Sequence, residues 1–88
     1  MNLTKSTIIE WTSMEANYND SITVEREAKI AEWVSLGLTD GIPIVISYTK
    51  TQRNWLDQEA AQAFIDFVSS LADKYTPGAI ISATIVDV

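Results

Sequence analysis

Carboxylates are the main side chains that could perform acid–base chemistry in this chain, because it contains no histidine and no cysteine. The candidates are two close pairs and one single residue: Asp57 with Glu59, Glu25 with Glu27, and Asp87. Both pairs lie where a helix is expected to begin, and negative charge at that position stabilises a helix. We therefore interpret the pairs as capping groups and predict no catalytic residue.

Metal and phosphate motifs are equally sparse. Asn17, Asn19 and Ser21 place oxygen atoms at alternating positions, as a calcium loop does, but the segment lacks the central glycine of such a loop. The three glycines of the chain stand singly at expected turns and form no phosphate-binding loop. The sequence therefore predicts no metal, nucleotide or other cofactor.

The composition is that of a folded protein with an acidic surface. Hydrophobic residues make up 47% of the 88 residues and charged residues 20%, which fits one domain over residues 1–88. Twelve acidic residues outnumber 6 basic ones, and the formal charge is -6. The basic residues are scattered among acids, so we expect no direct contact with nucleic acid. A basic protein is a partner that such a surface would attract.

Export and membrane signals are not evident in the sequence. No apolar run approaches the roughly 18 residues of a membrane span, and the first residues lack the apolar core of a signal peptide. Without cysteine there are no disulfides of the kind common in secreted domains. We expect a cytoplasmic protein that does not contact membranes.

The first half of the chain predicts a strand, a loop and a helix. Residues 7–12 are β-branched and aromatic, with Ile9 and Trp11 on one face. Residues 13–21 are polar and are expected to form a loop. A helix is predicted over 24–36, capped by Thr23. Its expected buried stripe is Val24, Ala28, Ala31 and Val34, widened on one side by Ile30 and Trp33.

The second half predicts two further strands around a second helix. Residues 44–46 are apolar on both faces, which is typical of a central strand covered on both sides, and residues 49–54 are expected to lead from it into a loop. Asp57 is the expected cap of a helix that ends at Pro77 and Gly78. The helix has a clear apolar stripe of Ala60, Phe64, Phe67, Val68, Leu71 and Tyr75. Residues 79–88 are predicted to form the last strand.

These elements predict an α+β fold in the order β-α-β-α-β. The expected arrangement is a two-layer sandwich of the split βαβ or ferredoxin-like kind, with two helices packed on one face of a small sheet. The last strand keeps apolar residues to the end of the sequence and would form an edge. We therefore predict that the protein forms a homo-oligomer.

Aromatic residues supply the candidate interface. Trp55 lies two residues before the expected helix cap, and two interpretations of it stay open. It either covers the end of the sheet as part of the core, which we favour, or anchors a protein interface together with Tyr48 and Arg53. Tyr18, in the polar loop, is the aromatic residue most expected to be exposed.

The segment "SYTKTQRNWLDQEAAQAFIDFVSSL" followed by "AIISATIVDV" resembles segments of small uncharacterised proteins encoded by tailed phages. It also looks like the β-α-β arm of dimeric ferredoxin-like domains, some of which are small oxygenases. The first resemblance implies a non-enzymatic accessory protein that acts by protein binding, as a host-directed inhibitor in the host cytoplasm or as a minor virion component. The second implies the alternative, a small cofactor-independent enzyme with a pocket between helices and sheet.

Overall fold

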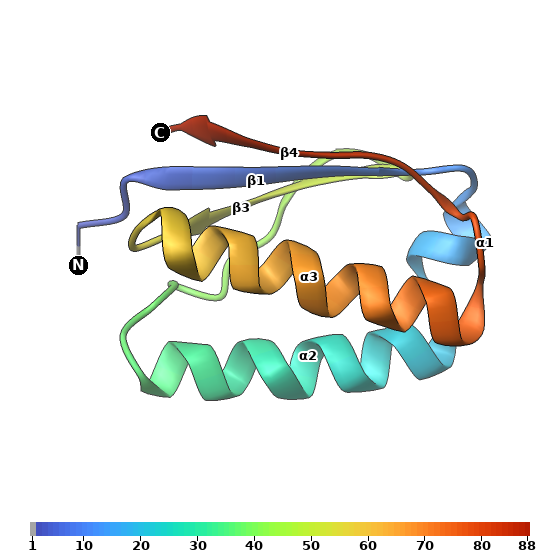
Figure 1. Cartoon of the computed structure of the whole chain (residues 1–88), viewed down its shortest axis with the longest axis horizontal. Coiled ribbons are helices and arrows are strands. Elements are labelled where there is room, and N and C mark those ends of the chain that lie inside the picture. Colours follow the sequence, from blue (N-terminus) through green and yellow to red (C-terminus); the bar gives the residue numbers. More distant parts are fainter. Residues whose placement is uncertain (1) are drawn as a thin grey trace.

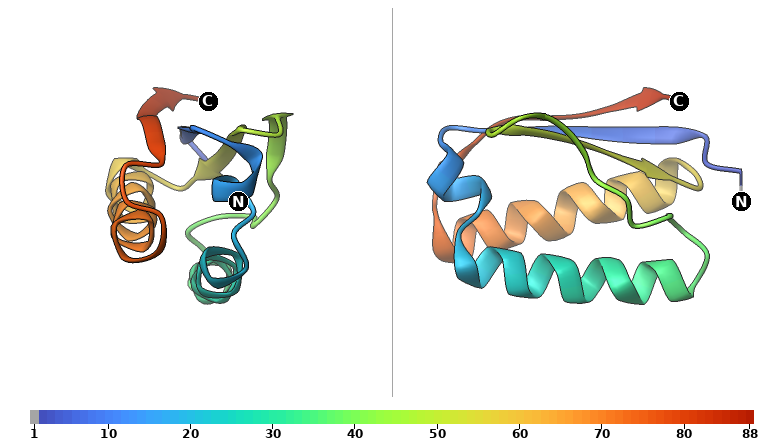
Figure 2. Two further views of the ribbon diagram at one scale, coloured as in Figure 1. Left: turned by 90° about the vertical axis from the view of Figure 1, so that its right-hand side faces the viewer. Right: turned by 180° about the vertical axis from the view of Figure 1, so that it is seen from behind.

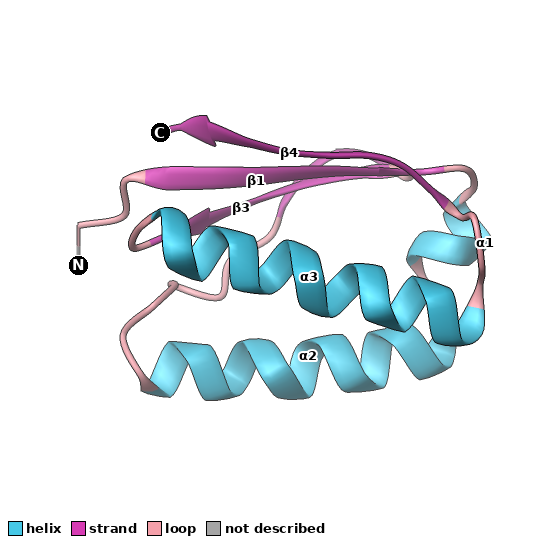
Figure 3. Ribbon diagram, viewed as in Figure 1, coloured by secondary structure: helices cyan, strands magenta, loops and turns pink. Residues whose placement is uncertain are grey.

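The computed structural model describes residues 2–88 and contains a four-stranded sheet with two long helices on one face (Figures 1 and 3). The strands are β1 (Lys5–Trp11), β2 (Ile44–Ser47), β3 (Lys50–Trp55) and β4 (Ile80–Asp87). The helices are α1 (Met14–Asn17), α2 (Asp20–Ser35) and α3 (Gln58–Tyr75). The α+β class with both long helices in one layer is confirmed.

The sheet is antiparallel and has the order β2-β3-β1-β4. Strand β1 is central and pairs with β3 and β4, so that Thr7 lies opposite Arg53 on one side and Ile85 on the other. In the end-on view of Figure 2, α2 and α3 lie beneath the sheet, and no helix of residues 2–88 covers its other face. Strands β2 and β4 are the two edges.

Helix α3 confirms the prediction from the sequence. The side chain of Asp57 accepts a hydrogen bond of 2.9 Å from the backbone N–H of Ala60, which satisfies one of the free donors of the first helical turn. The predicted stripe faces the sheet, and its members Ala60, Phe64, Val68 and Leu71 are buried. Phe67 and Tyr75 pack at the margin of this core.

The predicted order β-α-β-α-β is wrong, because the segment expected to be one central strand and a loop is a hairpin of two strands. The apolar residues 44–46 form the edge strand β2, whose residues are all exposed, and the polar residues 50–55 form β3 inside the sheet. Between the strands, the Ser47 hydroxyl accepts a hydrogen bond from the Thr49 backbone N–H and favours the turn.

The loop predicted over residues 13–21 contains the single-turn helix α1. Ser13 caps it by accepting a hydrogen bond from the Ala16 backbone, and Asn19 caps α2 in the same way through Ile22. Helix α2 therefore begins four residues earlier than predicted, and Thr23 is not its cap.

The buried face of α2 also differs from the predicted stripe. Ile22, Arg26, Ile30 and Trp33 are buried, whereas Val24 and Val34 are exposed. These four buried positions follow the three-and-four spacing of a helix face, but one of them is an arginine. The predicted stripe was chosen from apolar residues alone and therefore lies on a neighbouring face of α2, beside the one that is buried.

Trp55 lies at the centre of the core, as the favoured interpretation predicted, and its exposure is 0%. Its ring stacks on Phe64 of α3 at 4.8 Å and meets Trp33 of α2 edge-on at 5.4 Å between centroids. Its indole N–H donates a hydrogen bond of 3.0 Å to the Thr7 hydroxyl in β1. One side chain thus joins both long helices to the two central strands.

We expect Trp55→Ala to lower the free energy of unfolding by about 3–5 kcal/mol, because it leaves a large cavity and removes the hydrogen bond that the indole N–H donates to the Thr7 hydroxyl. Urea denaturation followed by circular dichroism measures the change. Val24→Ala is the control, because Val24 is 71% exposed, and it should change stability by less than about 0.5 kcal/mol. A Trp55→Ala protein as stable as the parent would contradict this account of the core.

Candidate functional sites

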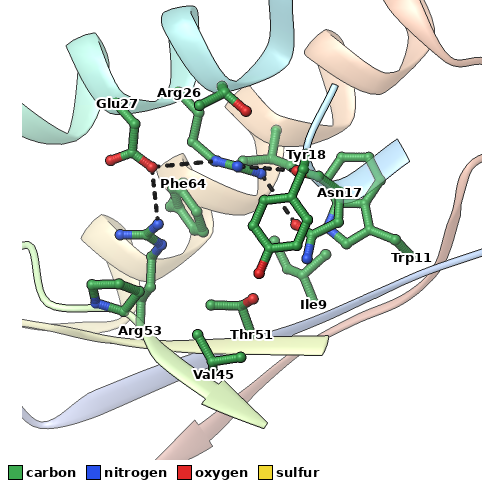
Figure 4. A pocket seen from close by; sticks show the side chains of 13 residues that line it. Ile9, Trp11, Asn17, Tyr18, Arg26, Glu27, Val45, Thr51, Arg53 and Phe64 are labelled. Atoms are coloured by element: carbon green, nitrogen blue, oxygen red, sulfur yellow. Dashed lines mark hydrogen bonds and ion pairs between the residues drawn. The ribbon is translucent and has the colours of Figure 1, made fainter. Parts of the chain in front are cut away.

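A cavity of about 160 Å³ lies between α2 and the inner face of the sheet (Figure 4). Much of its wall is apolar and comes from elements distant in the sequence. Ile9 and Trp11 belong to β1, Val45 to β2, and Phe64 and Val68 to α3. The cavity therefore offers a compact apolar space inside the fold.

Two arginines form the polar side of this cavity, and each is only 7% exposed. Arg26 lies one helical turn from both Ile22 and Ile30, so the same face of α2 that packs on the sheet carries its side chain inward. Arg53 pairs across the sheet with Thr7, a buried residue, and therefore also faces inward. The fold thus brings two guanidinium groups to one wall.

Glu27 lies between the two arginines. Its Oε1 atom accepts a hydrogen bond of 3.2 Å from Arg53 Nη2 and lies 3.7 Å from Arg26 Nε, which is an ion pair but too long for a hydrogen bond (Figure 4). Half of the Glu27 side chain is exposed. One partly solvated carboxylate is therefore shared by two buried cations.

Asn17 holds the other end of Arg26. The Arg26 guanidinium donates to the backbone oxygen of Asn17 at 3.0 Å and to its side-chain oxygen at 3.4 Å. Asn17 in turn donates through Nδ2 to the backbone oxygen of Tyr48 at 2.9 Å. This chain of contacts connects α2, α1 and the β2–β3 turn around the mouth of the cavity.

Burial is the main cause that lowers the pKa of both arginines, because a charged group loses hydration in the interior. Repulsion from Arg53 lowers the pKa of Arg26 further, and attraction to Glu27 opposes the shift in both. Guanidinium groups nevertheless remain protonated in proteins. The cavity wall therefore carries two positive charges against one negative charge.

Three of the residues that line this cavity each contain a buried polar atom with no hydrogen-bond partner among residues 2–88. These atoms are Thr23 Oγ1, Arg26 Nε and Arg53 Nη1. Buried donors in folded proteins are normally paired, and an unpaired donor costs about 1–3 kcal/mol. Their concentration at one place distinguishes this cavity from the rest of the core.

The predicted interface residues separate in the structure. Trp55 is in the core and Arg53 is in the cavity wall, whereas Tyr48 and Tyr18 are exposed. Tyr18 lies at the cavity beside Arg26 (Figure 4). Whether Tyr48 or Tyr18 contacts a partner stays a prediction.

Four of the five carboxylates considered for catalysis have structural partners, and the fifth, Glu59, lies in the first turn of α3. Asp57 is a helix cap, and Asp87 forms an ion pair with Lys5 that lowers its pKa through a hydrogen bond. Glu25 accepts a hydrogen bond from the Tyr75 hydroxyl, away from Glu27. The sequence did not indicate the roles of Arg26 and Asn17. The interruption of an apolar helix face by Arg26 was the available signal.

A second candidate site is the surface that we call the β2 edge, which consists of Ile42, Ile44, Val45, Ile46 and Tyr48. These side chains are between 42% and 71% exposed. Residues 42–49 include no charged residue, and β2 pairs with β3 on one side only. Natural proteins usually protect such an edge with charges or with covering segments.

Comparison of this chain with protein families, curated proteins and solved structures gives no match. Within the described part of the chain, no helix is long and apolar enough to cross a membrane. Residues 2–88 also contain no group of three or more acidic side chains placed to hold a metal ion. The site chemistry therefore has to be inferred from the geometry itself.

We expect Glu27→Gln to lower the free energy of unfolding by about 1–3 kcal/mol, because it leaves two buried guanidinium groups facing each other without a carboxylate. Because the Glu27 side chain is half exposed and its charge is partly screened by water, we expect a loss near the lower end of this range. Glu32→Gln is the control, since its ion pair with Lys29 lies on the surface, and should change stability by less than about 0.5 kcal/mol. Equal effects of the two substitutions in urea denaturation would contradict this assignment.

Proposed function

We propose that this protein is a non-enzymatic interaction protein that works as a homo-oligomer joined through the β2 edge. The observation that carries the proposal is the row of exposed apolar side chains on an unpaired edge strand. Free backbone N–H and C=O groups on such a strand pair readily with a strand from another chain. The apolar side chains would be removed from water by the same contact.

A second copy of the chain is the occupant that the charges favour. The protein carries a formal charge of -6, so most surfaces of two copies repel each other, but residues 42–49 bring no charge into the contact. Antiparallel pairing of β2 with its own copy follows a twofold axis and continues the sheet. The edge strand β4 also exposes Ile81 and Val86, but unlike residues 42–49 it carries a charge, at Asp87.

A ferredoxin-like arrangement is part of this proposal. If the single turn α1 is set aside, the elements follow the order β-α-β-β-α-β, with an antiparallel sheet and both helices on one face. The acidic surface outside the β2 edge favours a basic protein as a further partner. The resemblance to phage proteins extends the proposal to a host-directed inhibitor or a minor virion component.

The cavity favours a second candidate function, a small cofactor-independent enzyme with a pocket between helices and sheet. Its acid–base groups are Glu27 and the Tyr18 hydroxyl. Glu27 is engaged in ion pairs with both arginines, so its carboxylate is not free to contact a substrate. Binding is therefore the better supported role of the cavity.

We expect the protein to sediment as a dimer at micromolar concentration and Ile46→Lys to convert it to a monomer of 9.8 kDa. A lysine at this position would be present in both copies, so the proposed contact would bring two positive charges together. The lysine side chain is also better hydrated in the monomer, where the edge strand faces solvent. Sedimentation equilibrium measures both masses. Circular dichroism should show an unchanged fold, since Ile46 is exposed.

Val24→Lys is the matched control, because it places the same charge on an exposed apolar residue of α2 outside the β2 edge. It should leave the dimer intact. A parent protein that sediments as a monomer would overturn the proposal, and so would dissociation by both substitutions alike.

A further inference from the structure

We propose that the cavity between α2 and the sheet is a binding site for a small monocarboxylate with a compact apolar body. Arg26 and Arg53 would hold the carboxylate, and the apolar wall would hold the body. This inference is independent of the β2 edge, because it follows from the buried charges, the free donors and the shape of the cavity.

The charged side chains that line the cavity would be balanced by one additional negative group. Among the side chains that line the cavity, two guanidinium groups and the Glu27 carboxylate leave one positive charge in excess, and both arginines are more than nine-tenths buried. Asp40 lies outside this lining but also attracts Arg53. A buried charge without compensation is costly, and a bound monoanion restores balance. In a chain with a formal charge of -6, a local positive excess of this kind is unusual.

Each arginine keeps one buried nitrogen that makes no hydrogen bond within the described residues. Arg53 uses Nη2 for Glu27, while its Nη1 is buried and unpaired beside the cavity. Arg26 uses both terminal nitrogens for Asn17, while its Nε makes no hydrogen bond and lies 3.7 Å from Glu27 Oε1. Guanidinium N–H groups form their strongest hydrogen bonds with carboxylate oxygens. Thr23 Oγ1 is likewise buried and without a hydrogen-bond partner.

The apolar wall specifies the rest of the ligand. Phe64 and Trp11 provide aromatic surface, and Ile9, Val45 and Val68 provide aliphatic surface. The volume of about 160 Å³ is close to that of apolar cavities of roughly 150 Å³ that bind benzene. A benzene-sized or short branched body therefore fits, whereas a long acyl chain does not.

Inorganic phosphate fits this site less well than a monocarboxylate. It has no apolar part to occupy the space along Phe64 and Val68. Its second negative charge would exceed the single positive charge available and would meet the Glu27 carboxylate. The choice between these two anions is therefore a direct test of the inferred ligand class.

Isothermal titration calorimetry of the full chain with benzoate, benzamide and inorganic phosphate tests the proposal. We expect benzoate to bind at least about tenfold more tightly than the neutral isostere benzamide, because only benzoate compensates the charge of the arginines. Phosphate should bind at least about tenfold more weakly than benzoate. The NMR signals of Trp11 should shift with benzoate, since this side chain lines the cavity.

Two variants test separately the contribution of the arginine charge and that of the open cavity volume to benzoate binding. Arg53→Met removes one cation but keeps an apolar stem, and should weaken benzoate binding about tenfold or more. Thr51→Phe fills the cavity with a residue suited to a strand and leaves both arginines in place, and should have a similar effect. Lys29→Met is the control on the outer part of α2, where Lys29 pairs with Glu32, and should bind benzoate as the parent does.

Several outcomes would overturn the proposal. Equal binding of benzoate and benzamide would identify an apolar cavity without anion recognition. Equal binding of benzoate and phosphate that persists in Thr51→Phe would identify a surface anion site. No benzoate binding up to about 10 mM would remove the site altogether. If Arg53→Met does not fold, the three ligands on the parent protein and the Thr51→Phe variant still decide the question.

Discussion

The structure depends on the contact between the indole of Trp55 and the Phe64 ring, because this contact fixes α3 on the sheet and also forms part of the cavity. The Phe64 ring stacks on Trp55 and also lines the cavity. The guanidinium group of Arg53 lies 5.9 Å from the centre of this ring. The same aromatic group therefore belongs to the core and to the candidate site. A fold this small has few residues to separate the two tasks.

The sequence predicted those elements in which apolar residues and burial coincide. Strand β1 and helix α3 both show their buried face as a regular apolar pattern, with Ile9, Trp11, Phe64 and Val68 in the core. The β2–β3 hairpin was missed because its pattern is inverted: the apolar residues 44–46 lie at the edge, and the polar residues 50–55 lie inside the sheet. Strand β3 places Arg53 and Trp55 on the face that the helices cover, and its other residues are polar. The hydrophobicity of the segment therefore does not indicate that it lies inside the sheet.

The candidate site was predictable only in part, since it depends on pairs of residues that are distant in the sequence. Arg53 was noticed as an interface residue, but its contact with Glu27 requires β3 to lie against α2. Arg26 was hidden because the apolar residues beside it suggested another buried face of α2. A register shift has a similar effect in β4: opposite Glu10 and Trp11 the pairing is irregular, and Ile81 is exposed although simple alternation would place it on the same face as Ala83 and Ile85.

The β2 edge and the cavity both contain features that lower the stability of an isolated monomer. The two sites also adjoin each other. An exposed apolar edge promotes association, and a buried pair of arginines costs hydration that one shared carboxylate only partly restores. Val45 belongs to both places, since it is one of the exposed edge residues and also lines the cavity. The Arg26–Asn17–Tyr48 hydrogen bonds connect the cavity mouth to the turn that ends β2. Any energetic coupling between ligand binding and self-association would therefore pass through β2, and thermodynamic linkage requires that such coupling act equally in both directions.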